Sequence, residues 1–184
     1  TGNDRLWVVN PDNDSVTVFD AVTRAKLAEI NVGRAPRTLA VGPNGRAWVA
    51  NADSATITVL QSDFAVAQTI SLPRGSRPHG VVFDPAGANA FVALEDGGKV
   101  LKLNPANGAV VGELAVGLHV RHLSVTADGS QVLATRFVTP LLPGEDTDEV
   151  QTTVAGVDYG GEVLAIDAAG MTLLGTTILK HSEE

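Results

Sequence analysis

Three side chains that carry positive charge, or can take it up, recur at a fixed interval in the chain. Arg37, His79 and Arg121 are each 42 residues apart. Guanidinium groups bind carboxylates and phosphates through paired hydrogen bonds. Because equivalent positions of a repeat lie at equivalent places in space, this spacing predicts a cationic ring that binds an anion.

Other basic residues lie close to these three in the sequence. They complete the predicted ligand-binding set, which adds Arg34, Arg74, Arg77 and His122, with His119 beside them. A second interpretation stays open, in which these side chains bond to carbonyl groups or acidic loops of the neighbouring repeat. The pair formed by His119 and His122 precedes or begins a strand, where the two rings can point apart, so no metal site is predicted.

The whole chain repeats with a period of about 42 residues. The period is marked by two sets of glycines, Gly33, Gly75 and Gly117 and then Gly45, Gly87 and Gly129. Each repeat contains four runs in which apolar residues alternate with small or polar ones, as in half-buried strands. In the second repeat these runs span residues 37–43, 47–51, 56–61 and 65–73. A period of this size with short β segments is typical of β-propeller blades.

The sequence therefore predicts an all-β fold, a β-propeller segment of about four four-stranded antiparallel blades. The blades are expected at about residues 1–33, 34–74, 75–117 and 118–184. The first blade lacks the run that would form its innermost strand, which leaves open faces of mostly apolar residues. We expect either a fragment of a larger propeller or a homo-oligomer that completes one.

The propeller fold also predicts where the basic residues lie. The first strand of each blade lines the central channel, and the loop leading into it shares a face with the loop between the second and third strands. The predicted set therefore lies at the channel mouth on one face. The second-to-third-strand loops on that face are rich in Asn and Asp, which are ordinary turn formers. The loop at residues 10–14 is too short and generic to predict a calcium site.

Four segments of the repeat resemble the YVTN-type β-propeller family of bacterial and archaeal surface and periplasmic proteins. They are APRTLAVGPNG (35–45), WVAN (48–51), VTVFD (16–20) and INVG (30–33). The resemblance covers essentially the whole chain and implies a periplasmic or extracellular location. The fourth blade departs from the pattern, because LATRF (133–137) replaces the strand that ends in Asn.

The fourth repeat contains about 21 extra residues, in an insertion at about 137–160. It includes Glu145, Asp146, Asp148 and Glu149, and no Lys or Arg. Insertions into repeat arrays usually form loops on the working face. We expect a lid or docking arm that covers the channel mouth and competes with an anionic ligand; the alternative is a solvated loop.

Composition excludes several classes of function. The net charge of −8 argues against a binder of duplex nucleic acid, which needs a basic surface. The chain has no cysteine, which removes disulfides, thiolate metal sites and covalent c-type haem attachment. No apolar run approaches 18 residues, so no membrane span is expected.

Motifs for hydrolytic and nucleotide chemistry, such as G-x-S-x-G, H-E-x-x-H and the P-loop, are also missing from the sequence. The sequence favours a non-catalytic, extracytoplasmic β-propeller without a cofactor, which binds a protein partner or a small anionic ligand at the channel mouth. Two alternatives stay open. One is the propeller part of a periplasmic haem-associated redox or electron-transfer protein, and the other is a lactonase-like hydrolase.

Overall fold

The computed structural model describes residues 4–136, 153–154, 157–158 and 160–179. In this part of the chain, four antiparallel sheets contain three, four, four and four strands, and a fifth has two. The only helical element there is a short 3-10 turn, η1 (Pro11–Asn13). The structure therefore confirms the predicted all-β fold. No helix among the described residues is long and apolar enough to cross a membrane.

Each sheet of three or four strands is one blade, numbered here in chain order. Blade 1 contains β1 (Arg5–Asn10), β2 (Ser15–Asp20) and β3 (Lys26–Asn31). Blade 2 contains β4 (Pro36–Val41), β5 (Ala47–Asn51), β6 (Thr56–Leu60) and β7 (Val66–Ser71). Blade 3 contains β8 (Pro78–Phe83), β9 (Ala90–Leu94), β10 (Lys99–Leu103) and β11 (Val110–Ala115). Blade 4 contains β12 (Val120–Val125), β13 (Gln131–Arg136), β16 (Gly161–Asp167) and β17 (Thr172–Leu179).

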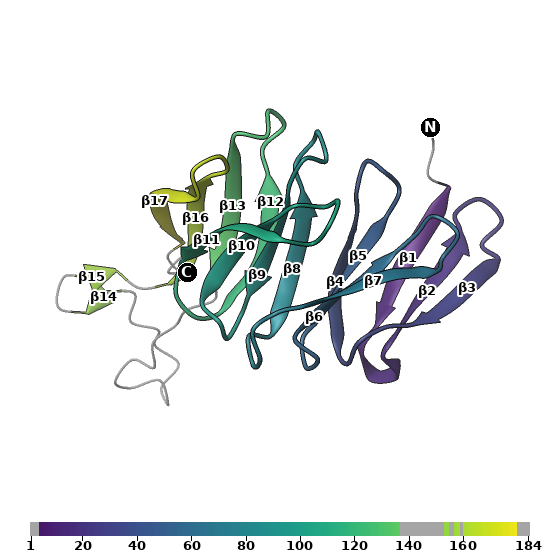
Figure 1. Ribbon diagram of the computed structural model, residues 1–184. Coiled ribbons are helices and arrows are strands. Elements are labelled where there is room, and N and C mark those ends of the chain that lie inside the picture. The colour runs from purple at the N-terminus through teal and green to yellow at the C-terminus, as the bar shows by residue number, and fades with distance from the viewer. Residues whose placement is uncertain (1–3, 137–152, 155–156, 159, 180–184) are drawn as a thin grey trace.

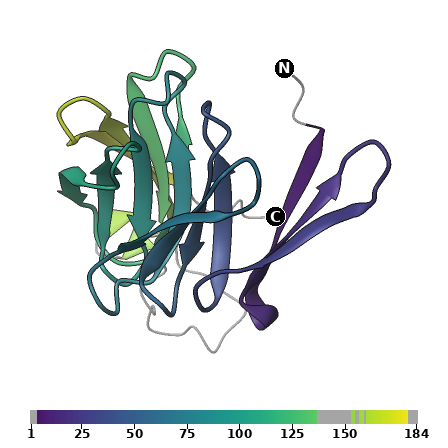
Figure 2. The same cartoon turned by 45° about the vertical axis from the view of Figure 1, so that its right-hand side comes forward.

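Blades 2, 3 and 4 begin with their innermost strand, and blade 1 has no such strand in the described residues. β4, β8 and β12 lie side by side, with β8 in the middle, and β1 of blade 1 lies next to β4 (Figures 1 and 2). β1 pairs only with β2, whereas the equivalent strands β5, β9 and β13 each pair on both sides. The structure is thus an open array of blades with a three-stranded sheet at one end.

The insertion leaves the array within blade 4. β13 pairs directly with β16, so residues 137–160 depart between the second and third strands of this blade. A small hairpin, formed by β14 (Thr153–Val154) and β15 (Val157–Asp158), lies within it. The predicted cover over the channel mouth and its four acidic residues, Glu145, Asp146, Asp148 and Glu149, lie outside the described residues.

Apolar side chains fill the space between consecutive sheets. Strand residues alternate between the two faces of a sheet, so each inner blade contributes to two separate cores. Trp48 of blade 2 packs toward blade 3, for example, while Val49 packs toward blade 1. Blade 4 packs on blade 3 in the same way, through Ile166 and the fully buried Phe91.

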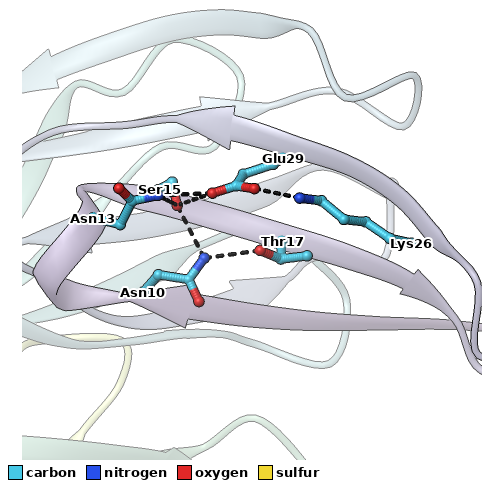
Figure 3. Close-up of polar contacts among 6 residues, drawn as sticks. All are labelled: Asn10, Asn13, Ser15, Thr17, Lys26 and Glu29. Atoms are coloured by element: carbon cyan, nitrogen blue, oxygen red, sulfur yellow. Dashed lines mark hydrogen bonds and ion pairs between the residues drawn. The ribbon is translucent and has the colours of Figure 1, made fainter.

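A polar network ties together the strands of blade 1 (Figure 3). Asn10, at the end of β1, donates from Nδ2 to Ser15 Oγ at 3.0 Å and to Thr17 Oγ1 at 2.9 Å. Ser15 donates to a carboxylate oxygen of Glu29, which is paired with Lys26. These bonds run from the second strand of the repeat to the third and fourth, so this asparagine is a structural residue.

The repeat position of Asn10 forms different polar contacts in blades 2 and 4. In blade 2, the fully buried Asn51 donates to Thr58 Oγ1 at 2.9 Å. In blade 4, Arg136 replaces the asparagine, and its Nη1 lies 2.8 Å from Glu162 Oε2. The departure of LATRF from the repeat pattern is therefore an exchange of one cross-strand tie for another.

Candidate functional site

The predicted cationic residues lie at a β-bulge in each innermost strand. The pairing of β4 with β5 is interrupted around Arg37, that of β8 with β9 around His79, and that of β12 with β13 around Arg121. A bulge bends the strand and redirects the side chain at that point, and bulges are frequent next to functional sites. The three equivalent residues are therefore presented by the same local geometry in three neighbouring blades.

A residue in the left-handed conformation precedes each of these strands. Ala35, Arg77 and His119 have φ angles of 50°, 47° and 66°, and each lies two residues before one of the three candidates. This conformation costs a non-glycine residue roughly 1–2 kcal/mol. Because the same backbone turn recurs at the same repeat position, the chain enters all three inner strands in the same way.

The two histidines of the set lie against each other across neighbouring blades. The ring centroids of His79, in β8, and His122, in β12, are 4.9 Å apart, and the planes meet edge to face at 82°. His79 is half-buried and His122 is exposed. The Nδ1 atom of His79 is buried and has no hydrogen-bond partner among the described residues.

The surroundings of His79 favour its neutral form. Burial is the main reason that the pKa of His79 lies below its usual value of 6.5. The electrostatic influence of His122, Arg121 and Arg37 lowers this pKa further, and Glu95 acts in the opposite direction. His79 therefore lies in a positive field to which three other members of the predicted set, Arg37, Arg121 and His122, contribute.

Arg121 forms an ion pair within the site. Its Nε donates to Glu95 Oε1 at 2.6 Å, and the Glu95 side chain is only 9% exposed. The same glutamate accepts a hydrogen bond at its backbone carbonyl from the His119 amide, at 2.8 Å. Glu95 thus joins the end of β9 to the start of β12 and offsets part of the positive charge.

The structure places Arg77 in the alternative role, a tie between blades. Its Nη1 lies 3.3 Å from Asp53 Oδ1 and its Nε lies 3.5 Å from Asp96 Oδ2. Arg34 and Arg74 are exposed, and neither side chain has an ion pair in the described part of the chain. The structure thus places Arg37, Arg121 and His122 close enough to His79 to lower its pKa, while Arg77 binds acidic loops.

Close contact between the inner strands fixes the spacing of the site. A Cβ atom on Gly80, the residue after His79, would lie 2.3 Å from the carbonyl oxygen of Arg121. On the other side of β8, the hydroxyl of Thr38 donates to the carbonyl of His79. β8 thus approaches β12 through backbone atoms at Gly80 and is bonded to β4 through the short side chain of Thr38.

A hollow of about 630 Å³ lies at the opposite ends of the same three strands. Its lining includes Val41, Phe83 and Val125, again 42 residues apart. The Asp84 carboxylate at its edge accepts hydrogen bonds from the Ala88 amide and from Asn89 Nδ2, both at 2.8 Å. The hollow is lined mostly by apolar residues and by none of the basic residues of the predicted set. The basic cluster is therefore a separate site, at the other end of the inner strands.

Glu95 is the site residue that the sequence analysis missed. It lies in a second-to-third-strand loop, directly after β9, at the position where blade 2 has the buried Ala52. A buried carboxylate needs a partner. A glutamate at a repeat position that is apolar in blade 2 could therefore have indicated an ion pair at this point. The described residues contain no group of three or more His, Asp or Glu side chains placed to hold a metal ion.

Comparison with known proteins supports the fold. No protein-family model matches the chain, and no curated protein matches it. Among solved structures, hydrazine synthase from Kuenenia stuttgartiensis is 22% identical, with a TM-score of 0.79 over 96% of this chain and 46% of the other.

Two further solved structures share the architecture. Dihydro-heme d1 dehydrogenase NirN in complex with DHE is 23% identical, with a TM-score of 0.68 over 96% of this chain and 34% of the other. Streptogramin B lyase is 14% identical, with a TM-score of 0.72 over 97% of this chain and 52% of the other. The chain thus spans about half or less of the length of these proteins, and at these identities the likeness shows the β-propeller fold alone.

Proposed function

We propose that this β-propeller segment binds a small anionic ligand through Arg37, His79, Arg121 and His122. One observation carries the proposal: His79 lies in a positive field to which the basic residues of all three inner strands contribute. In support, Arg37, His79 and Arg121 lie at equivalent bulges of neighbouring inner strands, each two residues after a left-handed turn. The resemblance to the YVTN-type repeats extends the proposal to a periplasmic or extracellular protein.

The basic side chains of the site contribute to anion binding in different ways. Arg37 is exposed and offers the guanidinium fork that suits a carboxylate or a phosphate. Arg121 donates from its Nε to Glu95 and adds the positive charge of its guanidinium group to the site. An anion also offsets the positive field around His79, so anion binding and protonation of His79 favour each other.

The proposal is tested by calorimetry with citrate and with inorganic phosphate at low salt. Loss of one charge-assisted hydrogen bond costs about 1.5–3 kcal/mol, so we expect Arg37→Ala to weaken binding by about tenfold or more. Arg46→Ala is the matched control, since Arg46 lies at the opposite end of β4 in the turn to β5 and should leave affinity unchanged. For an anion whose own charge does not change, affinity should also rise as the pH falls toward the lowered pKa of His79. No binding of either anion, or equal loss in both variants, would contradict the proposal.

A second candidate is the propeller part of a haem-associated redox protein. The observation that favours it is the buried, unpartnered Nδ1 of His79, whose lowered pKa favours the neutral imidazole that can act as a ligand. Arginines beside it would suit the carboxylates of a tetrapyrrole. NirN, whose fold this chain shares, is described in complex with DHE.

An absorbance titration with haemin separates the two candidates. A shifted haem spectrum that disappears in His79→Ala and persists in His119→Ala would favour the haem-associated protein. An unchanged spectrum together with citrate or phosphate binding would favour the anion site alone.

A further inference from the structure

The cores between blades follow one rule throughout the described array. Each sheet has a forward face, which packs on the next blade, and a backward face, which packs on the preceding blade. In blade 2, Trp48 and Ile57 belong to the forward face and pack toward blade 3. Ala47 and Val49 belong to its backward face and pack toward blade 1. All three junctions join a forward face to a backward face.

The backward face of blade 1 is open. Leu6 and Val8 in β1 lie opposite Phe19 and Thr17 in β2, so the four side chains share one face. Leu6 is 56% exposed and Val8 is 36% exposed. The residues equivalent to these two in blades 2 and 3 are all 0% exposed: Ala47, Val49, Ala90 and Val92. Blade 1 therefore presents apolar residues at positions that the other blades bury completely.

The forward face of blade 4 is open as well. Leu133 pairs with Ala165 and Thr135 with Val163, which places these four side chains on the face away from blade 3. Leu133, Val163 and Ala165 are partly exposed. Their counterparts on the forward face of blade 2, Trp48, Ile57 and Val59, are buried against blade 3. The four described side chains at the centre of this face, Leu133, Thr135, Val163 and Ala165, carry no charge.

One open face is a backward face and the other is a forward face. Both carry apolar residues at the positions that form the cores between blades. The equivalents of Leu6 and Leu133 meet in the same core at every junction, as Phe91 does with Val132 between blades 3 and 4. On the blade 1 face, Lys26 and Glu29 of the outer strand β3 neutralise each other in an ion pair. The side chains at the centre of the blade 1 face, Leu6, Val8, Thr17 and Phe19, are uncharged like those of blade 4.

We propose that a second copy of this chain packs head to tail on the first, with the backward face of blade 1 in one copy against the forward face of blade 4 in the other. The junction rule states which kind of surface fits each open face, a forward face against a backward face, and a second copy of the chain supplies both. A contact of this kind is heterologous and either closes a ring or continues. Two copies are the smallest closed assembly and bring eight blades together, within the range usual for propellers.

The first test is the mass of the chain in solution, by light scattering or sedimentation. We expect twice the monomer mass of 19.0 kDa or a higher multiple. Leu133→Arg should return the protein to the monomer. Val22→Arg is the control, because Val22 lies in the turn between β2 and β3, outside both faces, and is 74% exposed. A monomer at every concentration of the unaltered chain would overturn the proposal.

Cysteine cross-linking tests the direction of packing without relying on a disruptive variant. The chain has no cysteine, so single Leu6→Cys and Leu133→Cys variants each carry one thiol. Oxidation of an equal mixture should give a cross-linked pair, and either variant oxidised alone should remain at background. Cross-linking of Leu133→Cys with itself, or no cross-linking in the mixture, would overturn the head-to-tail contact. Both tests are independent of the proposed anion site.

Discussion

His79 combines burial, a histidine neighbour and two arginines, and this surrounding determines its charge. Its neutral form is favoured although the net charge of the whole chain is −8. Local placement therefore outweighs overall composition at this residue. The buried carboxylate of Glu95 offsets part of the positive charge through Arg121 and leaves a site that is still basic. A bound anion would offset this positive charge and raise the pKa of His79, so anion binding should favour proton uptake by His79.

The lowered pKa of His79 predicts a pH dependence of stability. The folded chain binds this proton less readily than the unfolded chain, whose histidine titrates near 6.5. The free energy of unfolding should therefore fall as the pH drops below about 6.5 and level off below the folded pKa. Urea unfolding at pH 7.5 and at pH 5, each with and without His79→Gln, measures this effect.

Two outcomes of that experiment distinguish His79 from the other histidines. His79→Gln should flatten the loss of stability between the two pH values. His119→Gln, which changes an exposed histidine in the same loop region, should leave the loss as in the unaltered chain. An identical loss in all three proteins would contradict the role given to His79.

At the scale of the element, the sequence predicted the inner strands and their candidate residues, because a period of 42 residues is visible in the types of amino acid. It could not predict which basic residues form ties between blades. Arg77 meets Asp53 from one loop and Asp96 from another. Both acids looked like ordinary turn formers, and only the packing of adjacent blades brings them to the same guanidinium.

The bulges were equally invisible in the sequence. They advance the chain by a residue, so that His122, and not only its neighbour Arg121, lies beside His79. A simple repeat alignment pairs His79 with Arg121 and misses the contact between the two rings. The distances between strands depend on Gly80 at the bulge, which leads to a prediction about this element.

Gly80→Ala should destabilise the protein strongly. The new methyl group would lie 2.3 Å from the backbone carbonyl of Arg121, where no side chain can rotate away. Overpacking commonly costs about 1–3 kcal/mol, and we expect the upper end of this range or more. Gly175→Ala is the matched control, because its Cβ would meet nothing within 4 Å in β17. Thermal and urea unfolding should show a large loss for Gly80→Ala and little change for Gly175→Ala; equal effects would contradict the close approach of β8 and β12.

At the scale of the whole molecule, the sequence predicted the blades because three blades repeat the same four-strand pattern and blade 1 repeats three of its strands. The insertion after Arg136 was visible only as a break in that period, since it has no second copy in the chain to compare with. The repeat also shows which residues a neighbouring blade would bury. Apolar residues at equivalent repeat positions are buried at the three junctions and exposed on the two end faces of the array.

The array also predicts a gradient of local stability along the chain. β1 pairs with one strand, whereas its equivalents β5 and β9 each pair with two. Local opening exposes strands with few partners first. Hydrogen exchange followed by mass spectrometry should therefore show faster exchange in Arg5–Asn10 than in Ala47–Asn51, by on the order of a hundredfold or more. Ala90–Leu94 should resemble the second of these.

Head-to-tail packing of two copies would leave this gradient in place. The proposed contact covers the side chains of Leu6 and Val8 on the face of blade 1, while the backbone groups on the free edge of β1 lie in the plane of the sheet and stay unpaired. Exchange in β1 should thus slow only slightly when the chain is concentrated enough to associate. Protection of β1 equal to that of β5 would show that another strand pairs with this edge, and the three-stranded form of blade 1 would then not be its state in solution.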